Sequence, residues 1–228
     1  MFKPSDLFDL GQTEHLAIFE GCEFAWDVLK KIKAYVAANA RPELRNKCEG
    51  RAWIGEQVLV GEGTVIEDGV MIKGPAIIGR NCQIRHNAYI REDVIIGDNC
   101  VVGNSSEVKN SIFFNYAQAP HFNYIGDSVL GYKAHIGAGV KISNLKLFND
   151  KVVIEFEGQK IDTGLRKFGA MMGDRSEVGC NAVLSPGTVI GRDSLVYANV
   201  TWRGVLPPNM IAKNRAAQEI VARRPSVG

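Results

Sequence analysis

The chain reads IGRNCQIRHNAYIREDVIIGDNCVV from Ile78 to Val102, with an aliphatic residue at every sixth position. The same register runs unbroken over a longer stretch: Ile54, Val60, Ile66, Ile72, Ile78, Ile84, Ile90, Ile96, Val102 and Val108. A period of six fits neither the 3.6-residue helix nor the two-residue strand. It predicts a solenoid of hexads, a parallel β-helix, in which one aliphatic residue per hexad points inward and Gly or Asn makes the corner.

The register shifts once between Val108 and Leu130, which are 22 positions apart. Because 22 is not a multiple of six, we expect three hexads plus four inserted residues, with segment 115–121 bulging from a coil as a loop. Hexads resume from Leu130 to Ile142 and, after a second insertion, from Met172 to Val196. Eighteen hexads make about six three-sided coils.

The segments outside the repeat predict three appendages. Residues 1–50 contain two expected helices between Thr13 and Ala40, which would cap the open end of the solenoid. Within the insertion 146–166, alternation of apolar and polar residues predicts a projecting hairpin. Pro207 and Pro208 are expected to stop the repeat, and a short helix is expected at 214–223. The predicted division is therefore a helical cap (1–50), a β-helix (51–206) and a helical tail (207–228).

Bulk composition excludes several classes of protein. A net charge of +2 over 228 residues is too small to indicate nucleic acid or a charged membrane surface as partner. The chain has no apolar run of about 18 residues and no signal peptide, so we expect a cytoplasmic protein. Its five cysteines form no Cys-x-x-Cys pair, so neither disulfides nor a zinc site are expected.

Three motifs carry a more specific resemblance: PHFNYIGD (Pro120 to Asp127), IGAG (Ile136 to Gly139) and Asn144. Residues 51 to about 205 resemble the acetyltransferase domain of bifunctional N-acetylglucosamine-1-phosphate uridyltransferase/glucosamine-1-phosphate acetyltransferase, and related archaeal sugar-1-phosphate nucleotidylyltransferases. The resemblance implies a left-handed parallel β-helix and a homotrimer with active sites between subunits. It also implies acetyl-CoA as acyl donor and an amino-sugar phosphate as acceptor.

The resemblance assigns a role to each matching position. His121 falls on the catalytic base, which takes the proton of an amine as it attacks the thioester. A backbone N–H of the Gly137–Gly139 region would stabilise the oxyanion, and no metal is needed. The acceptor contacts it implies are Arg91 and Lys109 on the sugar phosphate, with Tyr124, Asn144 and Lys167 on the sugar or phosphate. The acetyl-CoA contacts it implies are Ala138, Cys180, Ala198 and, reaching the CoA phosphates, Arg203.

Two departures from the family leave the acceptor open. The N-terminal segment is too short for a nucleotidyltransferase domain, so a separate nucleotidyltransferase is expected as partner. His135 stands where the family has an Asn beside the substrate amine. A γ-class carbonic anhydrase would need His86, His121 and His135 to converge on zinc. A non-catalytic trimeric scaffold or sugar-phosphate-binding module is the main alternative, although a scaffold has no need of His121 beside several cations.

Overall fold

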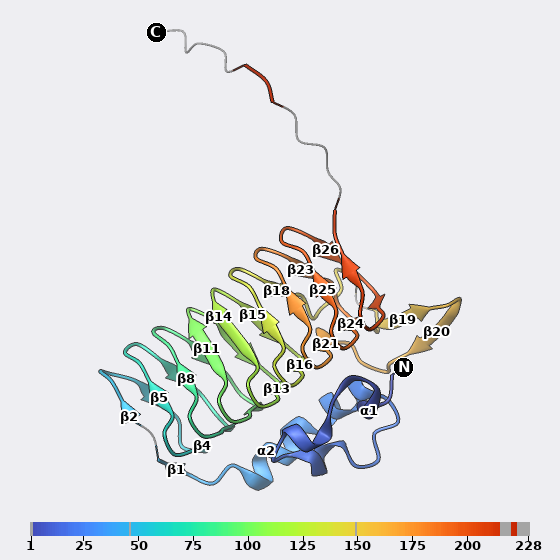
Figure 1. The fold of residues 1–228 in the computed structure, drawn as a ribbon. Coiled ribbons are helices and arrows are strands. Elements are labelled where there is room, and N and C mark those ends of the chain that lie inside the picture. The colour runs from blue at the N-terminus through green and yellow to red at the C-terminus, as the bar shows by residue number, and fades with distance from the viewer. Residues whose placement is uncertain (1, 46, 149, 215–219, 223–228) are drawn as a thin grey trace.

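Three parallel sheets form the body of the molecule (Figure 1). The computed structural model describes residues 2–45, 47–148, 150–214 and 220–222. Sheet A contains β1 (Glu43–Leu44), β4 (Val58–Val60), β7 (Ala76–Ile78), β10 (Val94–Ile96), β13 (Ser111–Phe113), β16 (Val129–Leu130), β21 (Ala170–Met172), β24 (Thr188–Ile190) and β27 (Val205–Leu206). Sheet B contains β2 (Lys47–Cys48), β5 (Val65–Ile66), β8 (Gln83–Ile84), β11 (Val101–Asn104), β14 (Gln118–His121), β17 (His135–Ile136), β22 (Glu177–Val178), β25 (Leu195–Val196) and β28 (Ile211–Ala212). Sheet C contains β3 (Trp53–Ile54), β6 (Met71–Ile72), β9 (Tyr89–Ile90), β12 (Glu107–Lys109), β15 (Tyr124–Gly126), β18 (Lys141–Ile142), β23 (Val183–Leu184) and β26 (Thr201–Trp202).

The solenoid fold predicted from the hexads is confirmed, but it has about nine turns and not six. Among the described residues, sheets A and B have nine strands each and sheet C has eight. The strands that lie outside the predicted hexads are β1, β2, β13, β14, β15, β26, β27 and β28. The first two precede residue 51, and β28 follows Pro207 and Pro208. The repeat therefore starts earlier than expected, and the two prolines do not stop it.

The prediction of a four-residue insertion between Val108 and Leu130 is wrong. Inward-facing residues on neighbouring coils are 18 residues apart where Ile78 pairs with Ile96. They are only 17 apart where Ile96 pairs with Phe113 and where Phe113 pairs with Leu130. Two successive turns are thus one residue short, each at the step from sheet C to sheet A. The segment between Val108 and Leu130 forms one further coil, β13 to β15, instead of a loop.

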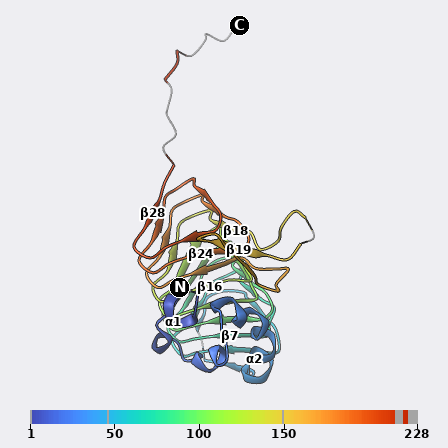
Figure 2. The same ribbon diagram turned by 90° about the vertical axis from the view of Figure 1, so that its right-hand side faces the viewer.

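The N-terminal segment lies along the outer face of sheet A (Figures 1 and 2). It contains α1 (Pro4–Leu7), the 3₁₀ helices η1 (Leu10–Gln12), η2 (Leu16–Phe19) and η3 (Ala25–Lys30), and α2 (Ile32–Asn39). The outward side chains of sheet A that it covers are apolar: Ile77, Ile95, Ile112, Val129, Met171 and Val189. The expected cap over the open end is therefore wrong, because this side of the prism has the apolar surface that the helices must bury.

Aromatic packing and one buried carboxylate attach the segment to the β-helix. The rings of Phe8 and Phe114 stack with centroids 5.0 Å apart. The fully buried side chain of Asp174 accepts hydrogen bonds from the backbone N–H of Asp9 at 2.6 Å and of Tyr132 at 2.8 Å. Burial raises the pKa of Asp174, and these two N–H donors oppose that shift. Asp174 thus connects the N-terminal segment with two turns of the solenoid.

A cavity of about 510 Å³ remains between the segment and sheet A, and it contains a half-buried histidine. His15 Nδ1 is 3.1 Å from the Tyr35 hydroxyl. Burial lowers the pKa of His15 below its ordinary 6.5, although the charges of Glu14 and Asp98 oppose the shift. The folded protein therefore binds fewer protons here than the unfolded chain, so its stability falls as the pH falls from about 6.5 through the folded pKa.

We expect a His15→Gln variant to lose less stability on acidification than the wild type. Between about pH 7 and about pH 5, the free energy of unfolding changes with pH in both proteins. Their two slopes differ by at most about 1.4 kcal/mol per pH unit, because only one group is removed. Urea unfolding of both proteins at the two pH values measures this difference. Parallel pH dependence in the two proteins would show that His15 is not buried in its neutral form.

The hairpin predicted within the insertion 146–166 is confirmed as β19 (Val153–Phe156) paired antiparallel with β20 (Gln159–Asp162). The hairpin packs against the body of the protein. Ile154 joins the apolar cluster on the outer face of sheet A, and the ring centroids of Phe156 and Phe2 lie 5.7 Å apart in an edge-to-face contact. The predicted helix at 214–223 falls mostly on residues outside those described. In the described part of the chain, no helix has the length and apolar character needed to cross a membrane.

Candidate functional site

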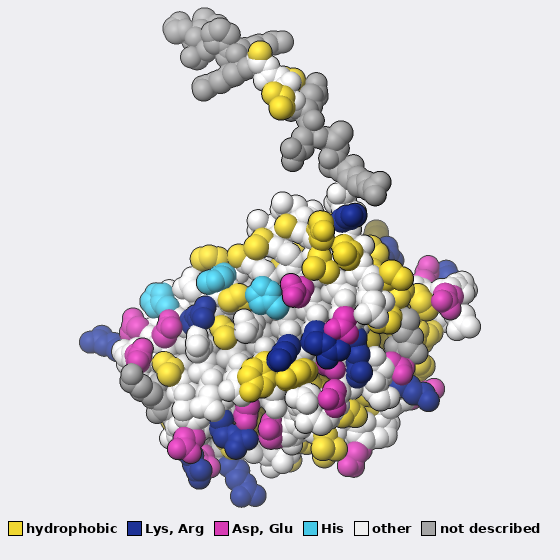
Figure 3. All heavy atoms as spheres, in the orientation of Figure 1, with side chains coloured by type: hydrophobic (Ala, Val, Ile, Leu, Met, Phe, Trp, Pro, Cys, Tyr) yellow, Lys and Arg dark blue, Asp and Glu magenta, His cyan; other side chains and the backbone are white. Residues whose placement is uncertain are grey.

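The corner between sheets B and C, here called the B–C corner, brings together four of the predicted site residues: His121, Ala138, Cys180 and Ala198. Backbone hydrogen bonds join them from coil to coil: Gly139 N–H to His121 O at 2.9 Å, Asn181 N–H to Ala138 O at 2.8 Å, and Asn199 N–H to Cys180 O at 2.9 Å. Three small side chains thus follow the histidine along one edge. On the side of the prism seen in Figure 3, histidine and hydrophobic side chains gather toward the top.

His121 ends β14, so the predicted loop 115–121 is mostly strand and does not bulge. Its backbone N–H donates to the Asn123 side-chain oxygen at 3.1 Å. Asn123 is buried and donates in turn to the Gly137 carbonyl at 2.7 Å, so its amide holds two neighbouring coils in place. The His121 side chain is exposed, and no described residue forms a hydrogen bond or ion pair with its imidazole. A rigid backbone therefore presents an available imidazole.

The Gly137–Gly139 region has one available backbone donor. Gly137 N–H donates to the Val178 carbonyl at 2.7 Å, and Gly139 N–H donates to the His121 carbonyl at 2.9 Å. Neither glycine can therefore stabilise an oxyanion, contrary to part of the expectation. Among the described residues, Ala138 N–H has no hydrogen-bond acceptor, so this amide is the candidate oxyanion donor at the B–C corner.

A cavity of about 250 Å³ opens beside this corner, on the face of sheet B. Its lining includes Cys180 and Ala198, two predicted acyl-CoA contacts, together with Gly137, Gly179 and Tyr197. A Cβ on Gly137 would come within 3.0 Å of the Cys180 Sγ, so the thiol lies over that glycine's backbone. The glycines therefore keep the cavity open along the coil edge, since a side chain at either would fill it.

His135 lines the same cavity as Cys180. In sheet B it pairs with Glu177 on the next coil, so the two side chains share the outward face. The resemblance predicts a place for His135 beside the acceptor amine. The structure places it in the lining of the cavity that also contains Cys180 and Ala198, which the resemblance assigns to the acyl donor.

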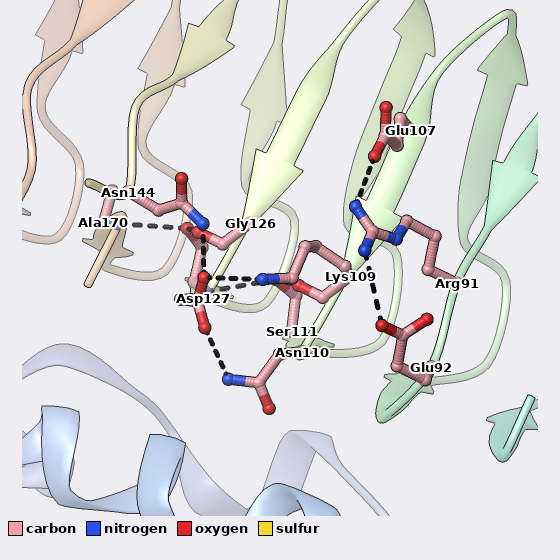
Figure 4. A network of polar contacts seen from close by, with 11 residues as sticks. Arg91, Glu92, Glu107, Lys109, Asn110, Ser111, Gly126, Asp127, Asn144 and Ala170 are labelled. Carbon is pink, nitrogen blue, oxygen red and sulfur yellow. Dashed lines mark hydrogen bonds and ion pairs between the residues drawn. The ribbon is translucent and has the colours of Figure 1, made fainter. Parts of the chain in front are cut away.

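Two other predicted acceptor contacts, Lys109 and Asn144, converge on a carboxylate at the corner between sheets C and A (Figure 4). Lys109 Nζ lies 3.2 Å from Asp127 Oδ2, and Asn110 Nδ2 donates to Asp127 Oδ1 at 2.8 Å. Asn144 Nδ2 also donates to Asp127. The exposed fractions of the Lys109 and Asp127 side chains are only 12% and 6%. We call Lys109, Asn110, Asp127 and Asn144 the Asp127 clasp. It connects the three coils that contain β12, β15 and β18, where the two shortened turns lie.

Arg91 is likewise paired, one coil before Lys109. Its Nη1 lies 3.0 Å from Glu107 and its Nη2 lies 3.3 Å from Glu92, whose other oxygen is 3.3 Å from Lys73 Nζ. The hydrogen bond that Arg91 donates to Glu107 raises the pKa of Arg91. Burial acts to raise the pKa of Glu92, but its backbone bond and the two cations lower it overall. Arg91 retains one free donor, because its buried Nε has no hydrogen-bond partner among the described atoms.

The remaining predicted residues lie in three different places. Tyr124 is on the outward face of β15, and its hydroxyl lies over Gly126, where a Cβ would approach it to 2.9 Å. Lys167 is exposed, follows the insertion and forms an isolated antiparallel β-bridge with Leu145. Arg203 lines a separate cavity of about 350 Å³ beside the hairpin, so the structure does not bring it together with Cys180 and Ala198.

Sequence reasoning missed the residues that hold the site in place. Asp127 lies within the PHFNYIGD motif but received no role, and Asn110 and Glu107 received none either. Their partners are 16 to 18 residues away, one coil along, which is a signal that the repeat length alone supplies. The zinc alternative gains no support, since the described residues contain no group of three or more candidate metal ligands.

Comparison with known proteins agrees with this architecture. Residues 72–159 match the family described as GMPPB C-terminal domain, and residues 171–201 match the hexapeptide repeat of succinyl-transferase. The chain is a hexapeptide-repeat β-helix, and its predicted resemblance to the acetyltransferase domain of the bifunctional sugar nucleotidylyltransferase/acetyltransferases is confirmed.

Two relatives carry that resemblance most directly. The bifunctional sugar-1-phosphate nucleotidylyltransferase/acetyltransferase of Sulfurisphaera tokodaii is 35% identical over 89 residues, covering 39% of this chain and 22% of the relative. Bifunctional protein GlmU of Methanococcus maripaludis is 35% identical over 91 residues, covering 40% and 22%. The matched stretch thus spans about a fifth of the length of these relatives.

Two solved structures are more distant. The polySia-specific acetyltransferase NeuO is 15% identical, covers 81% of this chain and 90% of its own, and has a TM-score of 0.39. PerB from Caulobacter crescentus, in complex with CoA and GDP-perosamine, is 18% identical, covers 75% and 52%, and has a TM-score of 0.26. These values are too low to carry an argument about this chain.

Proposed function

We propose that this protein is an acetyl-CoA-dependent N-acyltransferase that acts on an amino-sugar phosphate. The observation that carries the proposal is the B–C corner, where an available imidazole is followed on successive coils by Ala138, Cys180 and Ala198. The relative from Sulfurisphaera tokodaii supports the reaction class, since its name includes an acetyltransferase activity. An acyl donor would lie in the cavity beside Cys180, with its thioester toward His121.

The chemistry is a direct displacement. The acceptor amine attacks the thioester carbonyl, His121 takes the amine proton, and the tetrahedral intermediate expels the CoA thiolate. Imidazole suits this task because its ordinary pKa lies between pH 5 and 8. The free N–H of Ala138 would donate to the oxyanion. Holding both reactants at one corner supplies much of the rate enhancement.

The acceptor would lie on sheet C, across from the donor cavity. Tyr124 contacts the sugar in this proposal. Arg91, Lys109 and Asn144 shape the surface of sheet C on which the phosphate lies, through their bonds to Glu92, Glu107 and Asp127. Lys167 is a further cation for the phosphate. His135 lines the donor side of the corner, where it would contact the acyl group or the pantetheine. Arg203, beside the hairpin, would meet only the distal phosphates of CoA. No metal takes part.

We also propose a cytoplasmic homotrimer whose sites are completed by a neighbouring subunit. Trp53 and Met71 support assembly, because these neighbours on the outer face of sheet C are 53% and 40% exposed. Exposed apolar surface of this kind marks an interaction site. A separate nucleotidyltransferase would use the acetylated product.

A second candidate is a non-catalytic sugar-phosphate-binding module or scaffold. The observation that favours it is the pairing of Arg91 and Lys109 with carboxylates, which gives both cations a structural role. Such a module would bind a sugar phosphate and leave acetyl-CoA intact.

The deciding experiment measures thiol release from acetyl-CoA with glucosamine-1-phosphate and a panel of other amino sugars. We expect release that depends on the acceptor, and protection of the exposed Cys180 thiol from N-ethylmaleimide by CoA. The exposed Cys48 thiol, far from the cavity, should stay reactive and serves as the internal control. Sugar-phosphate binding with neither thiol release nor Cys180 protection would favour the scaffold.

A further inference from the structure

The described cations of sheet C divide into those with a carboxylate partner and those without. Arg203, which follows β26, forms no ion pair with any described residue, but it lines the separate cavity beside the hairpin. Lys73, Arg91 and Lys109, at corresponding positions on successive coils, all form ion pairs within 3.3 Å. Lys141, on β18, is exposed, and no described residue forms an ion pair or hydrogen bond with its ammonium. Its charge is therefore available to a ligand, whereas the other three are already neutralised.

The position of Lys141 relates it to the B–C corner. In sheet C it pairs with Tyr124, so the two outward side chains are neighbours on adjacent strands, about 4.8 Å apart along the sheet. Its ammonium leans back toward the corner, because Nζ lies 3.9 Å from the position that a Cβ on Gly139 would occupy. Gly139 is the residue whose N–H donates to the His121 carbonyl. The ammonium and the His121 backbone thus border one corner. The Tyr124 ring begins on the neighbouring strand, and its hydroxyl lies over Gly126.

The Asp127 clasp makes Lys109 a poor phosphate ligand by comparison. A phosphate that captured Lys109 would leave the Asp127 carboxylate, only 6% exposed, with its charge uncompensated. Breaking a buried pair in this way is strongly unfavourable. An exposed ammonium that already faces solvent has no such cost, so a phosphate placed near Tyr124 would bind Lys141 first.

We propose that Lys141 is the residue that gives this enzyme its preference for a phosphorylated acceptor. It binds the phosphate through charge-assisted hydrogen bonds while the amine of the same sugar lies at His121. Arg91 and the clasp keep the shape of the sheet. This inference rests on the proposed acyltransferase function and names the group that selects its substrate.

The test compares glucosamine-1-phosphate with unphosphorylated glucosamine in the wild type and in Lys141→Met. For the phosphorylated acceptor we expect kcat/KM to fall about 10–100-fold, mostly through KM, as for loss of one hydrogen bond to a charged group. For glucosamine the two proteins should agree within about twofold, and Lys141→Arg should keep most of the preference, because it retains the charge. The control is Lys160→Met, which removes an exposed lysine on the hairpin.

Calorimetric titration with glucosamine-1-phosphate in the absence of acetyl-CoA separates this inference from the proposed function. Weaker binding to Lys141→Met supports the phosphate role, even if no acceptor releases thiol. A wild type that transfers acetyl groups, beside a Lys141→Met variant with the same phosphate preference and affinity, overturns the inference and leaves the acyltransferase proposal standing. Absence of both turnover and sugar-phosphate binding in the wild type overturns both.

Discussion

Replacing His121 by alanine is expected to lower kcat about 10²–10⁴-fold, with little change in the KM for acetyl-CoA. The side chain is exposed and no described residue bonds its imidazole, so its removal deletes the proton acceptor and leaves the corner unchanged. The backbone bonds of His121 to Gly139 and Asn123 do not depend on its side chain. Thiol release under saturating acetyl-CoA measures the effect.

The matched control for this prediction is His86→Ala. His86 occupies the same corner two coils earlier, where its carbonyl accepts a bond from Ser105 at 3.1 Å. It is exposed, but it is remote from Ala138 and Cys180. We expect its removal to change kcat by less than about threefold. If His121→Ala retains full activity, or if the two variants lose activity equally, His121 is not the base.

Replacing Asp127 by asparagine is expected to destabilise the fold by about 3–5 kcal/mol. The variant leaves the Lys109 ammonium, 12% exposed, without its counter-charge, and it turns an acceptor of three donors into a group that also donates. Denaturant unfolding followed by tryptophan fluorescence measures the change. A loss of this size amounts to a large fraction of the stability of an ordinary domain.

Two further variants identify the cause of that loss. The double variant Lys109→Met with Asp127→Asn removes both charges and should recover part of the stability, since the unpaired ammonium is gone. Glu155→Gln breaks the exposed Lys160–Glu155 pair and should cost no more than about 1 kcal/mol. A cost for Asp127→Asn as small as that of Glu155→Gln would mean that the clasp contributes nothing beyond a surface ion pair.

The hexad register predicts the solenoid well because inward positions tolerate only a few side chains. It fails between Val108 and Leu130 because sheet A is buried on both of its faces. In β13, Ile112 points outward to the N-terminal segment and Phe113 points into the prism, and both are fully buried. Periodicity cannot choose between two adjacent apolar residues, so the sequence predicts an interruption where the structure has a turn of 17 residues.

These adjacent apolar residues are also a sequence signal that could have located the N-terminal segment. Apolar pairs such as Ile77–Ile78 and Ile95–Ile96 occupy every strand of sheet A from β4 to β27, whereas the outward positions of sheets B and C mix polar and apolar residues. They mark that side of the prism as covered. Amphipathic helices predict only that some apolar partner exists, and they do not say which surface provides it.

The residues of the candidate site also divide into those that the sequence predicts and those that it does not. His121 and the small residues at its corner could be predicted from a family resemblance, because their spacing along the chain is characteristic. The roles of Asp127 and Lys141 could not, since they depend on which charges meet across coils. Lys109 and Lys141 are alike in sequence, and only the three-dimensional structure separates a neutralised cation from a free one.

The N-terminal segment also changes how the solenoid can come apart. In a stack whose turns contact only their neighbours, each end can fray and the loss can spread turn by turn. Here one continuous stretch of chain packs on the outward residues of β7, β10, β13, β16, β21 and β24. No turn beneath it can open without breaking contacts shared with the others. A quasi-one-dimensional array thereby acquires the all-or-none cooperativity of a globular domain.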